Sequence, residues 1–173
     1  MGPLGNVEWW PNWEAYDWFV DQVWQHIKGD RELHIFGAHS ITLRGVSRTT
    51  LHRFVDELGD VLQGVDLMVK PIVSGSGVNV RVAEAIYNGM PMLCTPMAVA
   101  GLLAKPDPAI AVLERAEQWI SVLGGMTLLF WRNENLKPQR VCTSKAGTHA
   151  TSFATFLDRV ITQVESSGNV NPR

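Results

Sequence analysis

Apolar residues near the N-terminus recur at the spacing of a helix. Pro11 and Asn12 give a turn and cap signal, and apolar side chains then fall mostly three or four positions apart. They are Trp13, Tyr16, Val20, Val23, Trp24 and Ile27. Because such positions share one face of a helix, this stretch predicts a first helix that buries an aromatic stripe.

Short apolar runs beyond this helix predict strands that alternate with helices. We expect strands at residues 33–36, 41–46, 67–72, 90–95 and 126–131. We expect helices at residues 51–62, 81–88, 108–123 and 153–164. Such alternation predicts an α/β fold with a Rossmann-like, doubly wound parallel sheet, in which ligand loops lie at the carboxyl ends of the strands.

Length and composition indicate one globular domain with a short tail. The 173 residues are enough for one core and few for two. A content of 46% hydrophobic and 18% charged residues is typical of a globular protein. We expect residues 1–165 to form the domain, with an irregular excursion at 132–150, and residues 166–173 to fray.

Charge, hydropathy and cysteine usage indicate which classes of partner and which cellular compartment to expect. The formal net charge is −2 and the basic residues are scattered, which argues against nucleic acid as a partner. No apolar run approaches the roughly 20 residues of a membrane span, and the N-terminus lacks the pattern of a signal peptide. Cys94 and Cys142 have no CxxC spacing, so we expect two free thiols and a cytoplasmic location. The histidines show no metal-ligand spacing, so no metal site is predicted.

Residues 75–95 predict a glycine loop, a helix and a buried strand in succession. Gly75 and Gly77 free the backbone for tight geometry and expose amides at the start of a helix, where an anion is favoured. Glu84 follows two turns later, and a carboxylate there can accept hydrogen bonds from the vicinal hydroxyls of a ribose. Together these features predict a nucleotide site. An ordinary strand-to-helix turn is the alternative interpretation of the two glycines.

The same segment resembles the C-terminal, donor-binding domain of retaining glycosyltransferases with the GT-B fold, of the group 1 or family 4-like kind. The matching residues are Gly75, Ser76, Gly77, Arg81, Glu84, Ala85, Gly89 and Pro91. The resemblance covers roughly residues 4–103, from the aromatic stretch after Gly5 to the turn at 98–102. It implies transfer of a hexose from a nucleotide diphosphate sugar, with retention of configuration and without a metal or other cofactor.

The resemblance also implies roles for single residues. Arg81 would hold the diphosphate and stabilise it as it leaves, and Glu84 would position the ribose. A solvated surface arginine is the alternative interpretation of Arg81. Ser76 stands where many relatives have a glutamate that touches the sugar, and it could instead bind a phosphate or cap the helix. Asn6 and Pro11 stand where some relatives carry an arginine and a lysine.

Two further groups have both a binding and a structural interpretation. The resemblance brings backbone amides near the sugar and the phosphates after the strand at 90–95, at Thr95, Ala98, Gly101 and Leu102. A plain loop is the alternative there. The aromatic residues Trp9, Trp10 and Trp13 are interpreted as core and domain-interface packing, with a stacking platform for a base or sugar as the alternative. Trp9 or Trp10 left exposed would form the apolar patch that an absent partner surface predicts.

The resemblance also implies parts beyond these residues. The resembled fold has a central strand before the position of Gly5, so we expect that strand to be missing or truncated here. An N-terminal acceptor-binding domain or subunit would complete the enzyme. The alternative function is a non-catalytic nucleotide-sugar-binding or interaction module, and a third hypothesis is a sugar-nucleotide epimerase. Neither the base, the sugar nor the acceptor follows from the sequence.

Overall fold

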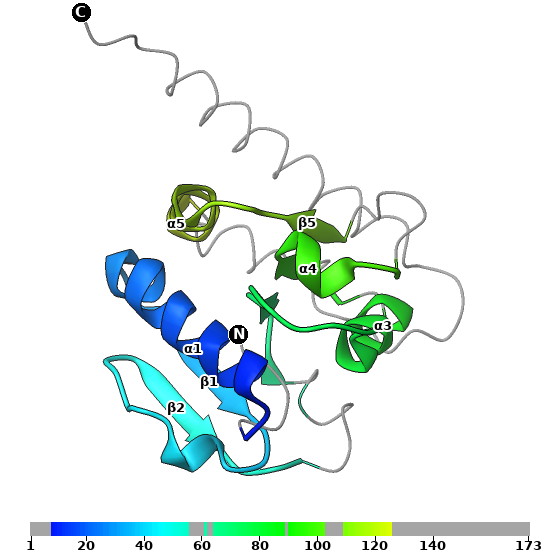
Figure 1. Cartoon of the computed structure of the whole chain (residues 1–173). Helices are drawn as coiled ribbons and strands as arrows, with labels where there is room; N and C mark the ends of the chain where they lie inside the picture. The colour runs from blue at the N-terminus through cyan, green and yellow to red at the C-terminus, as the bar shows by residue number, and fades with distance from the viewer. Residues whose placement is uncertain (1–7, 56–60, 62–63, 89, 103–108, 126–173) are drawn as a thin grey trace, which may run out of the picture.

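The computed structural model describes residues 8–55, 61, 64–88, 90–102 and 109–125. In chain order its elements are α1 (Trp10–Gln22), η1 (Trp24–His26), β1 (Leu33–Phe36), η2 (Ser40–Thr42), β2 (Thr49–His52), β3 (Met68–Lys70), α3 (Val80–Tyr87), β4 (Met92–Cys94), α4 (Pro96–Val99), β5 (Ile110–Val112) and α5 (Ala116–Gly125). Helices alternate with parallel strands (Figure 1), which confirms the predicted Rossmann-like α/β fold.

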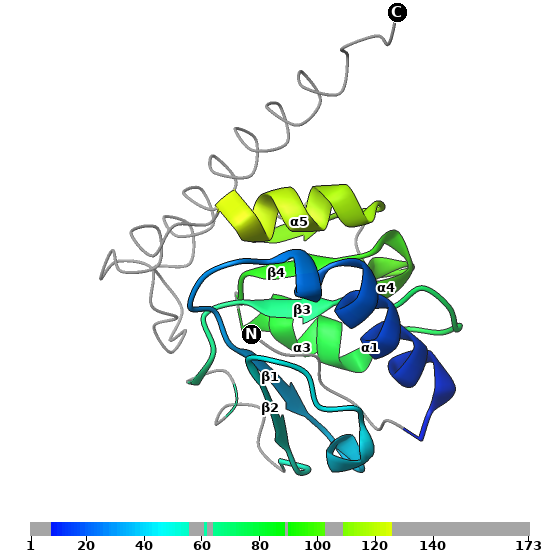
Figure 2. The ribbon, with the colours of Figure 1, turned by 90° about the vertical axis from the view of Figure 1, so that its left-hand side faces the viewer.

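The described strands form two parallel ladders. One pairs β1 with β2, and the other has the order β3-β4-β5. In the second ladder Met68 lies opposite Met92, and Lys70 lies opposite Cys94. Because these strands are parallel, the loops that follow β3 and β4 leave from the same edge of the sheet. In Figure 2, β3 and β4 lie between α5 and the β1–β2 ladder.

The two faces of the three-stranded ladder belong to different hydrophobic clusters. The cluster that includes residues of α1 and α5 contains the register partners Val69, Leu93 and Ala111. The cluster with α3 takes the row Met68, Met92 and Ile110. Figure 1 shows the same division, with α1 and α5 on one side of the strands and α3 on the other. Because side chains alternate along a strand, Lys70 projects to the α3 face, as Met68 does.

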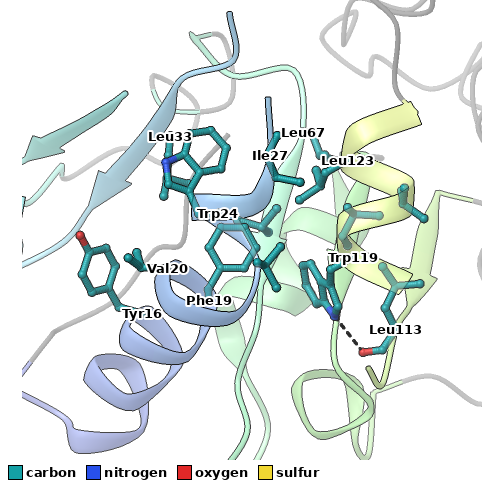
Figure 3. Packing of buried hydrophobic residues seen from close by; sticks show 14 of the residues in the cluster. Tyr16, Phe19, Val20, Trp24, Ile27, Leu33, Leu67, Leu113, Trp119 and Leu123 are labelled. Carbon is teal, nitrogen blue, oxygen red and sulfur yellow. Dashed lines mark hydrogen bonds between the residues drawn. The ribbon is translucent and has the colours of Figure 1, made fainter. Parts of the chain in front are cut away.

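Buried aromatic rings join α1 to α5. Trp119 of α5 is fully buried and meets Phe19 of α1 edge to face, with 5.6 Å between the ring centroids. Its indole Nε1 donates to the backbone carbonyl of Leu113 at 3.2 Å (Figure 3). The polar atom of the ring is therefore satisfied, and the rest of the ring contributes apolar area to the core.

Several elements agree with the sequence. The predicted first helix is α1 continued by η1, and the stripe from Tyr16 to Ile27 is buried, although Trp13 is 47% exposed. The strands predicted at 33–36, 67–72 and 90–95 correspond to β1, β3 and β4, and the helix predicted at 81–88 is α3. These segments carry continuous or strongly periodic apolar patterns, which are the most reliable local signals.

Other predictions of elements are wrong. The strand expected at 41–46 is instead the short helix η2 and a loop, and Ile41 at its start is 54% exposed. The second strand lies at Thr49–His52 and overlaps the first two residues of the helix expected at 51–62, because pairing with β1 outweighs the local pattern. The helix expected from residue 108 begins only at Ala116, since Ile110–Val112 pairs with β4 as β5.

Some predictions fall outside the described residues. They concern the strand before Gly5, the matching residue Gly89, the strand at 126–131, the excursion at 132–150, the last helix and the tail.

The buried indole of Trp119 gives a test of this core. We expect Trp119→Ala to lower the free energy of unfolding by about 3–5 kcal/mol, because a large ring is lost and a cavity remains. Trp10→Ala is the matched control, since Trp10 is 57% exposed, and should change it by less than about 0.5 kcal/mol. Urea denaturation of the three proteins measures both effects. Equal destabilisation by the two variants would contradict the placement of Trp119.

Candidate functional site

The loop that follows β3 is attached to the first turns of α1. Ser74 Oγ donates a hydrogen bond to the carboxylate of Glu14. Four residues earlier, Lys70 Nζ donates to Asn12 Oδ1 at 3.3 Å. Two segments about 60 residues apart in sequence therefore form one surface at the carboxyl edge of the strands.

Glycine is required where this loop passes α1. Gly75 has φ +114°, and a Cβ there would lie 3.3 Å from the Trp9 ring and 3.4 Å from Pro11. Gly77 has φ +89° with open space around it. L residues with a side chain are strained at such positive φ values. Both glycines therefore adopt the backbone geometry that their sequence positions predict.

The loop ends at the N-terminus of α3, where Asn79 is the cap. Its Oδ1 accepts a hydrogen bond from the backbone N–H of Val82 at 3.3 Å. Asn79, not Ser76, is thus the capping residue, and Ser76 is exposed on the loop. The partial positive charge at this end of the helix favours an anion in the adjoining space.

A cavity of about 460 Å³ occupies that space. Such a volume lies within the range of roughly 300–1,000 Å³ that is typical of small-molecule sites. Its lining comes from three regions of the chain, namely Trp9 and Asn12, then Lys70, Ile72 and residues 74–81, then Met97, Ala100 and Gly101. The predicted residues Gly75, Ser76, Gly77, Arg81 and Gly101 are therefore brought together.

Arg81 and Glu84 form an ion pair with each other. Arg81 Nη1 donates to Glu84 Oε2 at 2.8 Å, and both side chains are about one-third exposed. Arg81 lines the cavity, whereas Glu84 is not among the lining residues. The pair therefore orients the guanidinium beside the glycine loop, and a guanidinium has further N–H groups for a second acceptor.

The remaining predicted residues lie beside the cavity and not in its lining. Thr95 caps α4, and its Oγ1 accepts from the backbone N–H of Ala98 at 3.3 Å and donates to the carbonyl of Ile72. Ala98 is buried in the core cluster on the α3 face, and Leu102 packs against that cluster. Their observed contacts are structural.

The three N-terminal tryptophans are exposed and are not part of the core. Trp9 and Trp13 are each 47% exposed and Trp10 is 57% exposed. The interpretation of these rings as core is wrong for the described part of the chain. Trp9 lines the cavity, so its ring is the one that a bound ligand could contact.

Lys70 is the site residue that the sequence analysis did not single out. Its side chain is 2% exposed, at the carboxyl end of β3, and it lines the cavity. Burial, together with the positive charge of Arg81, lowers the pKa of Lys70 from its usual 10.5 to about 8. A lysine in an otherwise apolar strand just before the glycine loop is the signal that could have identified it.

Thiols and metal ligands add little to the site. Cys94 is a free, buried thiol, and burial raises its pKa to about 12. Cys142 lies outside the described residues. No group of three His, Cys, Asp or Glu in the described ranges is placed to hold a metal ion. Nor is any helix there both long and apolar enough to cross a bilayer.

The fold is Rossmann-like, and its cavity lies at the carboxyl edge of parallel strands, where proteins of this architecture commonly bind ligands. The family described as glycosyl transferases group 1 matches residues 2–121, and the chain belongs to this family. The predicted resemblance to a GT-B glycosyltransferase is thereby confirmed, and the general activity of the family is glycosyl transfer. No curated protein matches the chain.

The lowered pKa of Lys70 predicts how stability depends on pH. Between about pH 8 and 10 the unfolded chain binds a proton at Lys70 that the folded chain has lost, so the free energy of unfolding rises with pH. From pH 7.5 to 9.5 we expect the wild type to gain about 2 kcal/mol relative to Lys70→Met. Urea denaturation at both pH values measures this difference.

The control for this test is Lys28→Met, which removes an exposed ammonium. The stability of this variant should follow that of the wild type across the same pH range. A constant difference between wild type and Lys70→Met at both pH values would contradict the lowered pKa.

Proposed function

We propose that this chain is the donor-binding domain of a glycosyltransferase that uses a nucleotide diphosphate sugar. The observation that carries the proposal is the cavity in which the Gly75 loop, the N-terminus of α3 and Arg81 meet. Backbone amides and a guanidinium together suit a diphosphate, because both donate hydrogen bonds to anionic oxygens. The donor would carry a hexose, and an acceptor-binding domain or subunit would supply the other substrate.

The proposed chemistry places negative charge beside Arg81. The bond between the anomeric carbon and the diphosphate oxygen breaks, and its electron pair stays on the diphosphate. The acceptor hydroxyl oxygen bonds to the anomeric carbon, and its proton passes to an oxygen of the departing diphosphate. Arg81 and the loop amides would stabilise the leaving group as its charge grows, which is the role that a metal has in other transferases. We propose that the reaction retains configuration and needs neither a metal nor another cofactor.

Glu84 would serve both Arg81 and the ribose. A carboxylate has two oxygens, so Glu84 can hold Arg81 through Oε2 and accept from a ribose hydroxyl through Oε1. Ser76 would contact a phosphate or the sugar from the loop. The backbone near Thr95, Ala98, Gly101 and Leu102 would approach the sugar, for which Gly101 in the cavity lining is the best support.

A non-catalytic nucleotide-sugar-binding module is the second candidate. The observation that favours it is the position of Glu84, which bonds to Arg81 and is absent from the cavity lining. Such a module would bind the donor and transfer nothing, even with an acceptor-binding subunit present. In both cases the free thiol of Cys94 suits a reducing compartment such as the cytoplasm.

A thermal-shift titration against UDP, GDP, ADP and their sugar conjugates tests the proposal. A ligand at a hundred times its dissociation constant adds about 2.7 kcal/mol to the stability of the folded chain. We expect the melting temperature to rise with nucleotides of one base and to rise less with the matching nucleoside. A cooperative melt that no nucleotide changes would refute a donor site. A donor that binds but is never transferred to an acceptor would favour the module.

Replacement of Arg81 should separate diphosphate binding from nucleoside binding. We expect Arg81→Ala to weaken binding of the nucleoside diphosphate by about 1.5–3 kcal/mol and to leave nucleoside binding almost unchanged, because a charge-assisted hydrogen bond is lost. Calorimetric titration measures both affinities. Arg115→Ala, which removes an exposed guanidinium outside the cavity lining, is the control. An equal loss for both ligands would remove Arg81 from the phosphate role.

Replacement of Glu84 distinguishes its two roles. If the carboxylate accepts from the ribose, Glu84→Gln should reduce the preference for ribonucleotides over deoxyribonucleotides by about 0.5–1.5 kcal/mol. If it only orients Arg81, both kinds of diphosphate should weaken equally, and the preference should stay as in the wild type. Competition titrations with matched ribose and deoxyribose diphosphates measure the preference.

A further inference from the structure

Lys70 occupies a position that an apolar residue would otherwise fill. Its register partner across the ladder is the buried Cys94, and Met68 on the same face belongs to the cluster that packs on α3. A buried ammonium in such surroundings is unfavourable unless polar groups surround it. Methionine or leucine could fill this position without the cost of burying an ammonium, which indicates that the charge itself has a use.

Lys70, which is 2% exposed, shares the lining of the cavity with a second cation. Lys70 and Arg81 both line the cavity, and they are close enough for the charge of Arg81 to lower the pKa of Lys70. The two cations come from different elements, β3 and α3, on opposite sides of the Gly75 loop in sequence. Two like charges that converge on one cavity repel each other, and an anion bound between them would remove that repulsion.

The hydrogen bond to Asn12 positions the ammonium. Asn12 Oδ1 accepts from Lys70 Nζ at 3.3 Å, and Asn12 itself lines the cavity. An ammonium has three donors, and the bond to Asn12 uses one of them. Because Asn12 is neutral, it orients the ammonium without neutralising its charge.

We propose that Lys70 at the end of β3 and Arg81 in the first turn of α3 together bind the two phosphates of the donor. This inference rests on the proposed donor site and adds a second cation to it. Hydrogen bonds between an ammonium and phosphate oxygens are charge-assisted and strengthen in a site that excludes water. Lys70 would thus also stabilise the diphosphate as it leaves.

Calorimetric titration of the full chain tests this proposal with four probes, namely the nucleoside diphosphate that the wild type prefers among UDP, GDP and ADP, its monophosphate, its nucleoside, and inorganic pyrophosphate. We expect Lys70→Met to lower the affinity for the nucleoside diphosphate and for pyrophosphate about 10- to 100-fold. Binding of the nucleoside should change less than about twofold. The monophosphate should lose less affinity than the diphosphate, because it offers one phosphate to the two cations.

Two further variants separate charge from structure. Lys70→Gln keeps a donor for Asn12 and lacks the charge, so it should lose diphosphate affinity as Lys70→Met does. It also provides the test if Lys70→Met fails to fold. Lys28→Met removes an exposed positive charge elsewhere and should bind all four probes like the wild type.

The outcomes separate the role of Lys70 from the existence of the donor site. If the wild type binds the diphosphate and folded Lys70→Met or Lys70→Gln binds it equally well, the role of Lys70 is overturned and the donor site stands. If the variants lose nucleoside and diphosphate affinity to the same extent, Lys70 is structural. If the wild type binds none of the four probes, the proposed function fails and the role of Lys70 fails with it.

Discussion

The contact between the first turns of α1 and the loop after β3 shapes the whole site. Gly75 passes so close to Trp9 and Pro11 that a β-carbon would meet both side chains. The hydrogen bond from Ser74 to Glu14 holds the same loop from a second point. Because α1 is itself fixed by the aromatic core around Trp119, the position of the glycine loop depends on packing some distance away. The cavity is therefore a consequence of how a helix docks on a sheet.

A buried lysine at the end of a strand is the main electrostatic cost of this arrangement. Burial, and to a smaller extent the charge of Arg81, lowers the pKa of Lys70 to about 8. The folded chain therefore binds the proton of Lys70 less tightly than the unfolded chain does. Groups whose pKa is perturbed by burial and by a neighbouring charge cluster at functional sites. Here the buried positive charge is that of Lys70 in β3, and the neutral side chain of Asn12 in α1 is a hydrogen-bond partner of it.

Much of the site could be predicted from the sequence because its signals are local. Gly75, Gly77 and Arg81 stand at fixed offsets before and inside one helix, and the structure places all three around one cavity. Lys70 and Asn12 could not be paired in this way, since they are 58 positions apart and meet only when α1 lies over β3. Arg81 and Glu84 are only three positions apart, but whether they form an ion pair depends on their side-chain rotamers. The residue pattern is equally compatible with a separate role for each of them.

Local residue patterns are sufficient to predict the α/β class, the positions of α1, β1, β3, β4 and α3, and the glycine loop at the carboxyl end of a strand. Apolar periodicity and glycine chemistry act over a few residues, so these features need no distant partner. The packed structure is needed to show that residues 49–52 and 110–112 are strands, because each of these short segments is stabilised by hydrogen bonds to a strand elsewhere in the chain. It also shows which tryptophans are buried and that Lys70 lines the cavity. Burial and charge proximity are properties of the packed chain, and no local pattern contains them.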